Sequence, residues 1–262
     1  MIKVTFISGA TGGIGKAFCY ECAKNGDTLF LTGRSEDKLK KLGEELSSLY
    51  NVKFYYVACD LTDSDDRAKL YLYARENNFS ISRIILVAGV DTQKAFVEYT
   101  REKLLFQLRV NVESTVDIAH ELLKLKGEET EVIAVSSMSC VSPMPYFQVY
   151  SATKALILSL FTALRYELKK EKVKITTVLP GGVPTRLDII EDIKGQGLWG
   201  RLSSKSPEFV ARGSLKAVKK NKATYIPGFF NKFLYFIMKI APKKIVLKFI
   251  ANRWKNLTKD AF

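Results

Sequence analysis

A glycine-rich turn near the N-terminus constrains the fold more than any other feature of the chain. Residues 3–7 (Lys-Val-Thr-Phe-Ile) form a short β-branched and aromatic run that predicts a buried strand. The run leads directly into Ser8-Gly9-Ala10-Thr11-Gly12-Gly13-Ile14-Gly15, and a helical segment follows over residues 16–25. Glycines at this spacing allow a tight turn and leave the helix N-terminus open to an anion. The order of strand, turn and helix predicts a nucleotide phosphate site, and a tight turn without a ligand is the alternative.

Strand-like runs alternate with helical stretches along most of the chain. They occupy residues 3–8, 28–32, 53–58, 83–87, 131–136 and 174–179, and a seventh strand is expected near 223–226. This alternation predicts an α/β fold with a parallel sheet covered on both faces. The length of 262 residues suits one such domain with a full core. We expect residues 1–227 to form a dinucleotide-binding oxidoreductase domain and residues 228–262 to form a helical extension of it.

A tyrosine and a lysine four residues apart form the second informative motif. Tyr150-Ser151-Ala152-Thr153-Lys154 places a phenol and an ammonium group on one face of a helix. Ser137 stands upstream, just after the apolar run 132–135. Because an opposite charge favours the phenolate, Lys154 is expected to lower the pKa of Tyr150 from about 10. Tyr150 is therefore predicted to be a proton donor usable near neutral pH.

The spacing Gly9-x-x-x-Gly13-x-Gly15, taken together with Ser137, Tyr150 and Lys154, resembles the short-chain dehydrogenase/reductase family over residues 1 to about 190. The resemblance implies a Rossmann-type doubly wound sheet in the order 3-2-1-4-5-6-7, with the cofactor across its carboxyl edge. It implies that Tyr150 protonates a substrate oxygen that Ser137 polarises, and that Lys154 also bonds the nicotinamide ribose. Asn111 matches the helix asparagine of the family and would hold a proton-relaying water.

The same resemblance assigns cofactor contacts to several separate parts of the chain. Asp60 corresponds to an adenine-contacting aspartate, and Thr185 corresponds to a threonine at the nicotinamide carboxamide. The expected contacts are Ser8, Gly9, Thr11, Gly12, Gly13, Ile14, Gly15, Arg34, Ser35, Asp60, Leu61, Ala88, Gly89, Asn111, Tyr150, Lys154, Pro180, Gly181, Val183 and Thr185. One motif departs from the family, which has Asn-Asn-Ala-Gly where this chain has Leu86-Val87-Ala88-Gly89. The two amides that tie neighbouring strands together are thus replaced by apolar side chains.

The end of the second predicted strand bears on the choice of nucleotide. An enzyme that uses NAD needs a carboxylate there to accept from the ribose hydroxyls. This chain has Arg34 and Ser35 instead, which can donate to a 2′-phosphate. NADP(H) is therefore the preferred cofactor. The alternative is that Arg34 stacks on the adenine and that NAD(H) is accepted as well.

The positive charge of the chain is concentrated in its last quarter. The formal net charge is +14, and residues 201–262 contain 15 Lys and Arg against 2 Asp and Glu. This asymmetry indicates an anionic partner for the C-terminal part. Apolar and aromatic residues recur with a helical period over 229–240, Pro242 ends that pattern, and a second basic stretch follows. The unbroken apolar run is too short to span a bilayer.

Three interpretations of residues 228–262 stay open at this point. The segment could cap the substrate pocket, form a subunit contact, or lie on an anionic membrane as a peripheral helix pair. Nucleic acid is not expected as a partner, because the chain has no recognisable reader motif. By resemblance to the family, helices near 102–126 and 148–170 would pair subunits into a homodimer or homotetramer.

Cysteine, histidine and the N-terminal sequence argue against several other functions. Cys19-x-x-Cys22 lies in the middle of a predicted helix without a second pair, so we expect small buried side chains and no metal site. His120, the single histidine, belongs to no Ser-His-Asp arrangement and is expected to be structural or on the surface. No signal-peptide pattern precedes the first strand, which predicts a cytoplasmic protein, with peripheral membrane association left open.

The substrate is expected to be lipophilic. Residues 184–206 are predicted to form a lid with apolar side chains and with hinges at Gly195, Gly197 and Gly200. The apolar lid residues are Leu187, Ile189, Ile190, Leu198 and Trp199, and the residues expected to line the same pocket between Ser137 and Tyr150 are Met138, Val141, Met144, Pro145, Tyr146 and Phe147. A ketone such as a 3-oxoacyl chain, a sphingoid-type base or a steroid would suit this pocket.

The predicted activity is reversible, NADPH-dependent reduction of such a ketone to a secondary alcohol. The alternative is a catalytically silent NADP(H)-binding regulator or scaffold, with contact to a membrane surface left open. Asn111, Ser137, Tyr150 and Lys154 are all intact in the sequence, which favours the enzyme.

Overall fold

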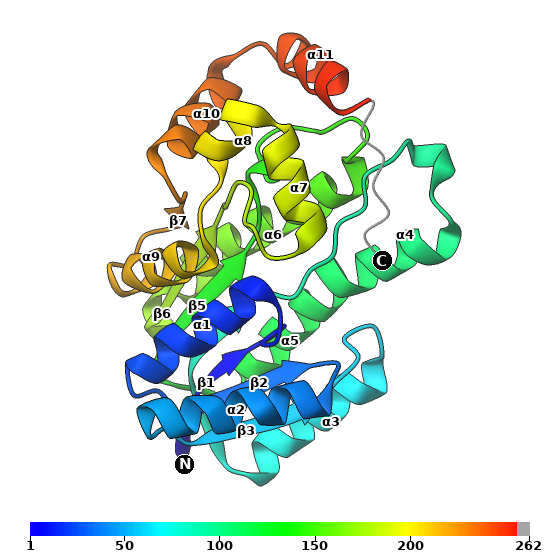
Figure 1. Ribbon diagram of the computed structural model, residues 1–262. Helices are drawn as coiled ribbons and strands as arrows, with labels where there is room; N and C mark the ends of the chain where they lie inside the picture. The colour runs from blue at the N-terminus through cyan, green and yellow to red at the C-terminus, as the bar shows by residue number, and fades with distance from the viewer. Residues whose placement is uncertain (256–262) are drawn as a thin grey trace.

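Seven parallel strands form one sheet in the order β3-β2-β1-β4-β5-β6-β7, with helices on both of its faces (Figure 1). The computed structural model describes residues 1–255, apart from the side chains of residues 188 and 192. The strands are β1 (Ile2–Ile7), β2 (Leu29–Gly33), β3 (Phe54–Ala58), β4 (Phe79–Leu86), β5 (Lys126–Val135), β6 (Val173–Val178) and β7 (Thr224–Tyr225). The predicted doubly wound fold and its strand order are confirmed.

The central strands are buried on both faces toward their carboxyl ends, which explains the apolar runs that end β4 and β5. Consecutive residues point to opposite sides, so Ile7 lies in one buried cluster and Phe6 lies in the other. The helices that cover the first face are α1 (Gly13–Lys24), α2 (Glu36–Tyr50) and α9 (Pro207–Lys219). The helices that cover the second are α3 (Ser64–Glu76), α5 (Ser114–Leu123) and α6 (Gln148–Glu167).

Strands β4 and β5 begin earlier than the sequence predicts. The expected starts were residues 83 and 131, whereas the strands begin at Phe79 and Lys126. The pairing of β4 with β5 shifts between Ile81 and Arg83, and Ile81 pairs with Lys126 across this irregularity. The early part of β5 contains glycine and two glutamates, so hydrophobicity gives no sign of it. Pairing with a neighbouring strand makes this segment extended.

The helix expected over 102–126 is interrupted in its middle. It consists of α4 (Arg101–Leu108), a π-helical segment η2 (Arg109–Glu113) and α5. Single π-helical turns inside α-helices are frequent at functional sites, and this one contains Asn111. The structure also has three short 3₁₀ segments in this half of the chain, which are η1 (Phe96–Glu98), η3 (Met138–Cys140) and η4 (Leu168–Glu171).

Four helices gather at one end of the molecule, at the top of Figure 1. The predicted lid over 184–206 contains α7 (Leu187–Gly195) and α8 (Gly197–Ser203). The predicted C-terminal extension contains α10 (Phe229–Ile240) and α11 (Lys243–Trp254), which are separated only by Ala241 and Pro242. Residues 256–262 of that extension lie outside the described residues.

Candidate active site

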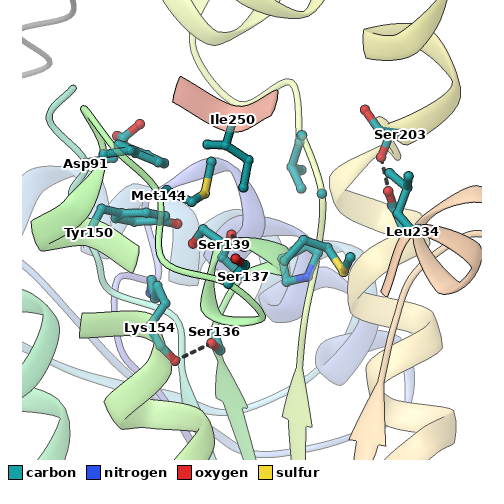
Figure 2. A pocket seen from close by; sticks show the side chains of 18 of the residues that line it. Asp91, Ser136, Ser137, Ser139, Met144, Tyr150, Lys154, Ser203, Leu234 and Ile250 are labelled. Atoms are coloured by element: carbon teal, nitrogen blue, oxygen red, sulfur yellow. Dashed lines mark hydrogen bonds between the residues drawn. The ribbon is translucent and has the colours of Figure 1, made fainter. Parts of the chain in front are cut away.

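Ser137, Tyr150, Lys154 and Asn111 come from three different elements and meet at one place. Ser137 caps η3 directly after β5, Tyr150 and Lys154 lie on α6, and Asn111 lies on η2. The first three line the same cavity, and Figure 2 shows the Tyr150 hydroxyl pointing toward Ser137. Asn111 is next to them, because a Cβ built on Gly89 would lie 3.1 Å from Lys154 Nζ and 3.4 Å from Asn111 Oδ1. The fold thus brings together the residues predicted to be catalytic.

Hydrogen bonds fasten Lys154 to the end of β5. Lys154 Nζ donates to the carbonyl oxygen of Val135 at 3.0 Å, and Ser136 Oγ donates to the carbonyl oxygen of Lys154 at 2.7 Å. Lys154 is only 4 % exposed, so its side chain has little freedom. The first turns of α6 are therefore fixed relative to the loop that contains Ser137.

The side chain of Asn111 holds the loop that follows β4. Its Nδ2 group donates to the carbonyl oxygen of Val90 at 2.8 Å and to Thr153 Oγ1 at 3.1 Å, while its Oδ1 atom accepts from the Val90 N–H at 2.8 Å. Both amide protons are engaged in this way. The relay of protons through a water at Asn111 stays a prediction.

Ser8 compensates for the altered motif after β4. Its buried hydroxyl oxygen accepts from the backbone N–H groups of Val87 at 3.0 Å and Ala88 at 3.3 Å. These bonds tie the glycine turn to the end of β4, where the family pattern has two asparagines. Ser8 thus has a structural role here, and its contact with a cofactor stays a prediction.

The expected acidity of Tyr150 is wrong for this structure. Burial raises the pKa of the Tyr150 hydroxyl above its ordinary value, and the carboxylate of Asp91 raises it further. A hydrogen bond with Ser137 and the charge of Arg186 act in the opposite direction. The ammonium group of Lys154 lies 5.6 Å from the centroid of the Tyr150 ring and donates to Val135. Lys154 is thus placed over the ring, and desolvation of the phenol dominates.

Lys154 also titrates in an unusual range. Burial lowers the pKa of its ammonium group to about 8, while Asp91 and Cys140 oppose this shift. The lysine therefore changes its charge close to physiological pH.

The glycine turn provides a cradle at the carboxyl edge of the sheet. Gly9 has a φ of 62°, which strains other residues, and a Cβ there would lie 3.1 Å from the Ala88 backbone. Helix α1 begins without a side-chain cap, whereas Ser35, Asp63 and Ser206 cap α2, α3 and α9. Its first N–H groups are therefore open to an anion, as a pyrophosphate requires.

Other expected cofactor residues surround this cradle. A Cβ on Gly13 would lie 2.5 Å from Thr185 Cγ2, so the turn adjoins the loop after β6. Thr11 adjoins the end of β2, since its Oγ1 atom lies 3.3 Å from a Cβ built on Gly33. Further expected contacts that line the cavity are Ile14, Gly89, Pro180, Gly181, Val183 and Thr185. This arrangement fits a dinucleotide laid along the sheet edge.

Arg34 and Ser35 differ in their availability. Arg34 is exposed directly after β2, and its guanidinium group has no ion pair among the described residues. The Ser35 hydroxyl accepts from the Lys38 N–H at 3.4 Å and caps α2. Arg34 is therefore the better placed of the two for a phosphate.

The loop predicted to contact adenine is held mainly by its own hydrogen bonds. The Asp60 Oδ1 atom accepts from the backbone N–H of Thr62 at 2.9 Å and from its hydroxyl at 2.8 Å. The Leu61 side chain is buried in the core, and its carbonyl oxygen accepts from the buried Arg67 at 2.7 Å. Leu61 thus offers its backbone, and not its side chain, to a cofactor.

A cavity of about 650 Å³, open to solvent on one side, lies between this sheet edge and the four helices at the top of the molecule. We refer to the helical side of the cavity as the roof. The roof residues that line the cavity are Ile189, Ile193, Gln196, Trp199, Ser203, Asn231, Leu234, Ile237, Met238, Ile245, Val246, Phe249, Ile250, Arg253 and Trp254. The C-terminal helices therefore cap the pocket, as one of the three interpretations of this segment required.

The expected lining residues are only partly confirmed. Met138, Met144 and Phe147 line the cavity, together with Ile189 and Trp199 of the roof. Those outside the lining are Val141, Pro145, Tyr146, Leu187, Ile190 and Leu198. Two of these face outward, since Leu187 is 80 % exposed and Leu198 is 71 % exposed.

The glycines of the predicted hinges have different surroundings. Gly195 and Gly197 have open space where a Cβ would stand, whereas a Cβ on Gly200 would overlap the Ile193 carbonyl oxygen. Gly200 thus permits α8 to pack against the end of α7.

Two polar side chains that no sequence motif predicts hold the roof together. Asn231 is 1 % exposed and donates from Nδ2 to the carbonyl oxygens of Ser203 and Pro227, both at 2.8 Å. Arg253 donates to Gln196 Oε1 at 3.3 Å and lies 5.5 Å above the Trp199 ring. Asn231 could have been noticed as the polar residue on an otherwise apolar helix face, but no sequence signal identified Arg253.

Aromatic rings connect the roof to Tyr150. Phe147 stacks on Tyr150 with ring centroids 4.5 Å apart, and Trp254 of α11 stacks on Phe147 at 5.6 Å. The C-terminal end of α11 is thus connected to the Tyr150 ring through Phe147.

Ser139, Asp91 and Arg186 are further polar groups in the cavity wall. The Ser139 hydroxyl is buried without a hydrogen-bond partner among the described residues, and Figure 2 shows it beside Ser137. A buried polar group without a partner is costly, so Ser139 is available to a polar group of a ligand. Asp91 and Arg186 form an ion pair of 3.1 Å beside Tyr150. Their positions depend on the loops after β4 and β6, which no motif predicts.

The remaining candidate residues lie away from this site. Cys19 and Cys22 are fully buried in the core, where burial raises the pKa of the Cys22 thiol to about 12. His120 is exposed beside Glu121. Among the side chains that the structure describes, no cluster of three or more His, Cys, Asp or Glu could hold a metal ion. No helix in the described part of the chain has the length and apolar character needed to cross a membrane.

Fold and site together define a nucleotide-dependent oxidoreductase, and comparison with known proteins gives its family. The profile of the family described as short chain dehydrogenase matches residues 3–192. The chain belongs to this short-chain dehydrogenase/reductase family, whose members use NAD(P)(H).

Relatives with assigned activities cover most of the chain. A 7beta-hydroxysteroid dehydrogenase of Mediterraneibacter gnavus is 30 % identical, over 86 % of this chain and 86 % of its own length. A very-long-chain 3-oxoacyl-CoA reductase of Bos taurus is 29 % identical, over 81 % of this chain and 67 % of its own length. A structure from a study of 7beta-hydroxysteroid dehydrogenase stereoselectivity has a TM-score of 0.84 at 25 % identity, covering 95 % of this chain and 96 % of that one.

Proposed function

We propose that this enzyme catalyses the reversible, NADPH-dependent reduction of a lipophilic ketone to a secondary alcohol. The observation that supports this proposal best is the position of Ser137, Tyr150 and Lys154 in the wall of one cavity under an apolar roof. Reactive polar side chains that lie together at the base of an apolar pocket are typical of the active site of an enzyme for small molecules.

Tyr150 is the proton donor in this mechanism. When bound, a reduced nicotinamide supplies the hydride. Burial keeps the Tyr150 hydroxyl protonated, as an acid that protonates the developing alkoxide must be. Ser137 donates a hydrogen bond to the same oxygen, an interaction that strengthens as negative charge develops. In its cationic form, Lys154 stabilises the phenolate that Tyr150 leaves behind.

NADPH is proposed as the nucleotide because of Arg34. Its guanidinium group is exposed directly after β2, where a carboxylate would select NADH. Guanidinium groups bind phosphate with charge-assisted hydrogen bonds. Acceptance of NADH is the alternative, if Arg34 stacks on the adenine instead.

A steroid or a 3-oxoacyl chain is the proposed class of substrate. The roof presents apolar side chains such as Leu234, Met238 and Ile250 to the cavity. The two relatives described above are named for a hydroxysteroid and for a very-long-chain 3-oxoacyl-CoA. A hydroxysteroid and a very-long-chain 3-oxoacyl group each have the reacting oxygen on a large apolar skeleton, which matches the division of the cavity into a polar base and an apolar roof.

The direct test is a panel of ketones assayed by the loss of NADPH absorbance, with NADH in parallel. The panel contains steroid ketones, 3-oxoacyl esters and small water-soluble ketones of similar reactivity. We expect turnover of a lipophilic ketone with NADPH. If NADPH binds in calorimetry but no ketone or alcohol is converted in either direction, the silent regulator is the better interpretation.

We infer that the enzyme also pairs through α4, α5 and α6, which occupy the segments expected to join subunits. Apolar side chains on these helices reach solvent, including Val116 at 37 % exposure and Leu156 at 39 %. Sedimentation equilibrium tests this inference, and a monomer at assay concentration would contradict it.

A further inference from the structure

Helix α10 has apolar side chains on two opposite faces. Leu234 and Met238 point into the cavity on one side. On the other side, Phe229, Phe233, Phe236 and Ile240 recur at helical spacing and are 85 %, 52 %, 60 % and 63 % exposed, respectively. Folding of this chain therefore leaves a row of three phenylalanines and an isoleucine in water.

Helix α11, which follows α10 after Ala241 and Pro242, also has exposed apolar side chains. Ile245 is 64 % exposed and Phe249 is 55 % exposed, and both also reach the cavity. We use the name α10–α11 surface for the exposed apolar residues Phe229, Phe233, Phe236, Ile237, Ile240, Ile245 and Phe249. Large apolar side chains that gather in water along neighbouring segments mark a contact with a partner or a membrane.

Exposed lysines accompany the α10–α11 surface, and acidic residues do not. Lys232 and Lys239 lie on α10, and Lys243, Lys244 and Lys248 lie on α11; all five are exposed. The sequence has no Asp or Glu between Glu208 and Asp260. On α10 the two lysines follow the same side of the aromatic row, at helical spacing. The segment therefore combines an apolar stripe with positive charge and has no negative charge.

We propose that the α10–α11 surface docks on an anionic lipid bilayer, with its aromatic side chains in the interface and its lysines at the headgroups. Helices of this composition lie in the plane of the membrane, and each nearby Lys or Arg contributes about 1 kcal/mol on anionic lipid. A second copy of the chain fits this surface less well, because a two-fold contact would place lysines against lysines without any acidic residue. No described helix can cross the bilayer, so the contact is peripheral.

Docking in this orientation would link the bilayer to the active site. Phe249 and Ile245 belong both to the α10–α11 surface and to the lining of the cavity. A lipophilic substrate dissolved in the membrane would then enter beside α11 without crossing water. This last step depends on the proposed function, whereas the docking itself does not.

Vesicle sedimentation of the full-length protein without cofactor or substrate tests the docking. The vesicles contain either equal parts phosphatidylcholine and phosphatidylserine, or phosphatidylcholine alone. We expect the protein to pellet with the anionic vesicles and to be released as salt is raised, because screening weakens the attraction. Equal binding to both vesicles, or binding to neither, would overturn the proposal.

Two double variants and their matched controls locate the contact. Phe233→Ser with Phe236→Ser, and Lys232→Glu with Lys248→Glu, are each expected to weaken binding to anionic vesicles by about tenfold or more. The control Phe96→Ser removes a phenylalanine of similar exposure, 59 %, and Lys169→Glu with Lys170→Glu makes the same charge change on η4. Both controls should bind as the parent does.

Self-association is measured on the same proteins without lipid. A dimer that the phenylalanine variant dissociates, together with no vesicle binding by the parent, would assign the α10–α11 surface to a second copy instead. Turnover of a water-soluble ketone should be unchanged in all of these variants. A failure to dock would therefore leave the proposed reaction untouched, and an inactive parent that docks would contradict only the reaction.

Discussion

The base of the cavity and its roof are built by different interactions. The base is fixed by short hydrogen bonds such as Lys154 Nζ to the Val135 carbonyl at 3.0 Å and Asn111 Nδ2 to the Val90 carbonyl at 2.8 Å. The roof consists of apolar helices that a few polar contacts join, among them Asn231 to Ser203. Hydrogen bonds of fixed geometry position reacting atoms, whereas apolar contact accommodates a range of shapes. We therefore expect changes at the base to alter turnover and changes in the roof to alter substrate affinity.

Replacement of Tyr150 at the base should have the largest effect. A Tyr150→Phe variant removes the proton donor but keeps the ring that stacks on Phe147 at 4.5 Å. We expect turnover to fall by roughly two to four orders of magnitude, since general acid catalysis contributes that much. NADPH oxidation in the presence of the best ketone measures it, and calorimetry should show unchanged nucleotide binding. Turnover equal to that of the parent would remove Tyr150 from its assigned role.

A substitution of Arg34 tests whether cofactor preference depends on a single side chain, as turnover is expected to depend on Tyr150. An Arg34→Asp variant replaces a phosphate donor with a carboxylate that can accept from ribose hydroxyls. The NADPH-to-NADH ratio of kcat/KM should fall by about 10- to 100-fold, as expected for loss of a charge-assisted hydrogen bond. Lys170→Asp introduces the same change of charge in η4 and serves as the control. An unchanged ratio would mean that Arg34 does not discriminate between the nucleotides.

The charge of Lys154 sets the expected pH dependence. Burial lowers the pKa of this ammonium group to about 8, so Lys154 loses its proton as pH rises through that value. The reduction then loses the positive charge that stabilises the Tyr150 phenolate, and kcat/KM should fall about tenfold for each further pH unit. A reduction rate that increases above pH 8 would contradict this assignment.

The sequence predicted the base of the cavity better than the roof for a physical reason. The spacing of Tyr150 and Lys154 on one helix fixes their relative position, and parallel strands bring Ser137 to the same edge as the glycine turn. The position of Arg253 beside Trp199 depends on how four amphipathic helices pack, which local pattern does not determine. The raised pKa of Tyr150 was missed because desolvation depends on the same packing.

Strand β5 shows the same dependence on long-range structure within the fold. Its polar beginning at Lys126 pairs with Ile81 of β4. The sequence of this beginning, residues 126–130, does not by itself indicate a strand. The predicted strand order was nevertheless confirmed, because it depends on the alternation of elements and not on where each one begins.

A single substitution in the roof should have the smallest effect, but it distinguishes most clearly between the contributions of the base and of the roof. Met238→Ala removes an apolar contact from the cavity side of α10. The loss of buried apolar area should raise KM for a lipophilic ketone about five- to tenfold, while kcat stays close to that of the parent. Phe236→Ala changes the exposed side of the same helix and should leave KM for a ketone in detergent-free solution unaltered. If Met238→Ala lowers kcat as strongly as it raises KM, the roof contributes to the chemical step. The expectation that the base controls turnover and the roof controls substrate affinity would then be wrong.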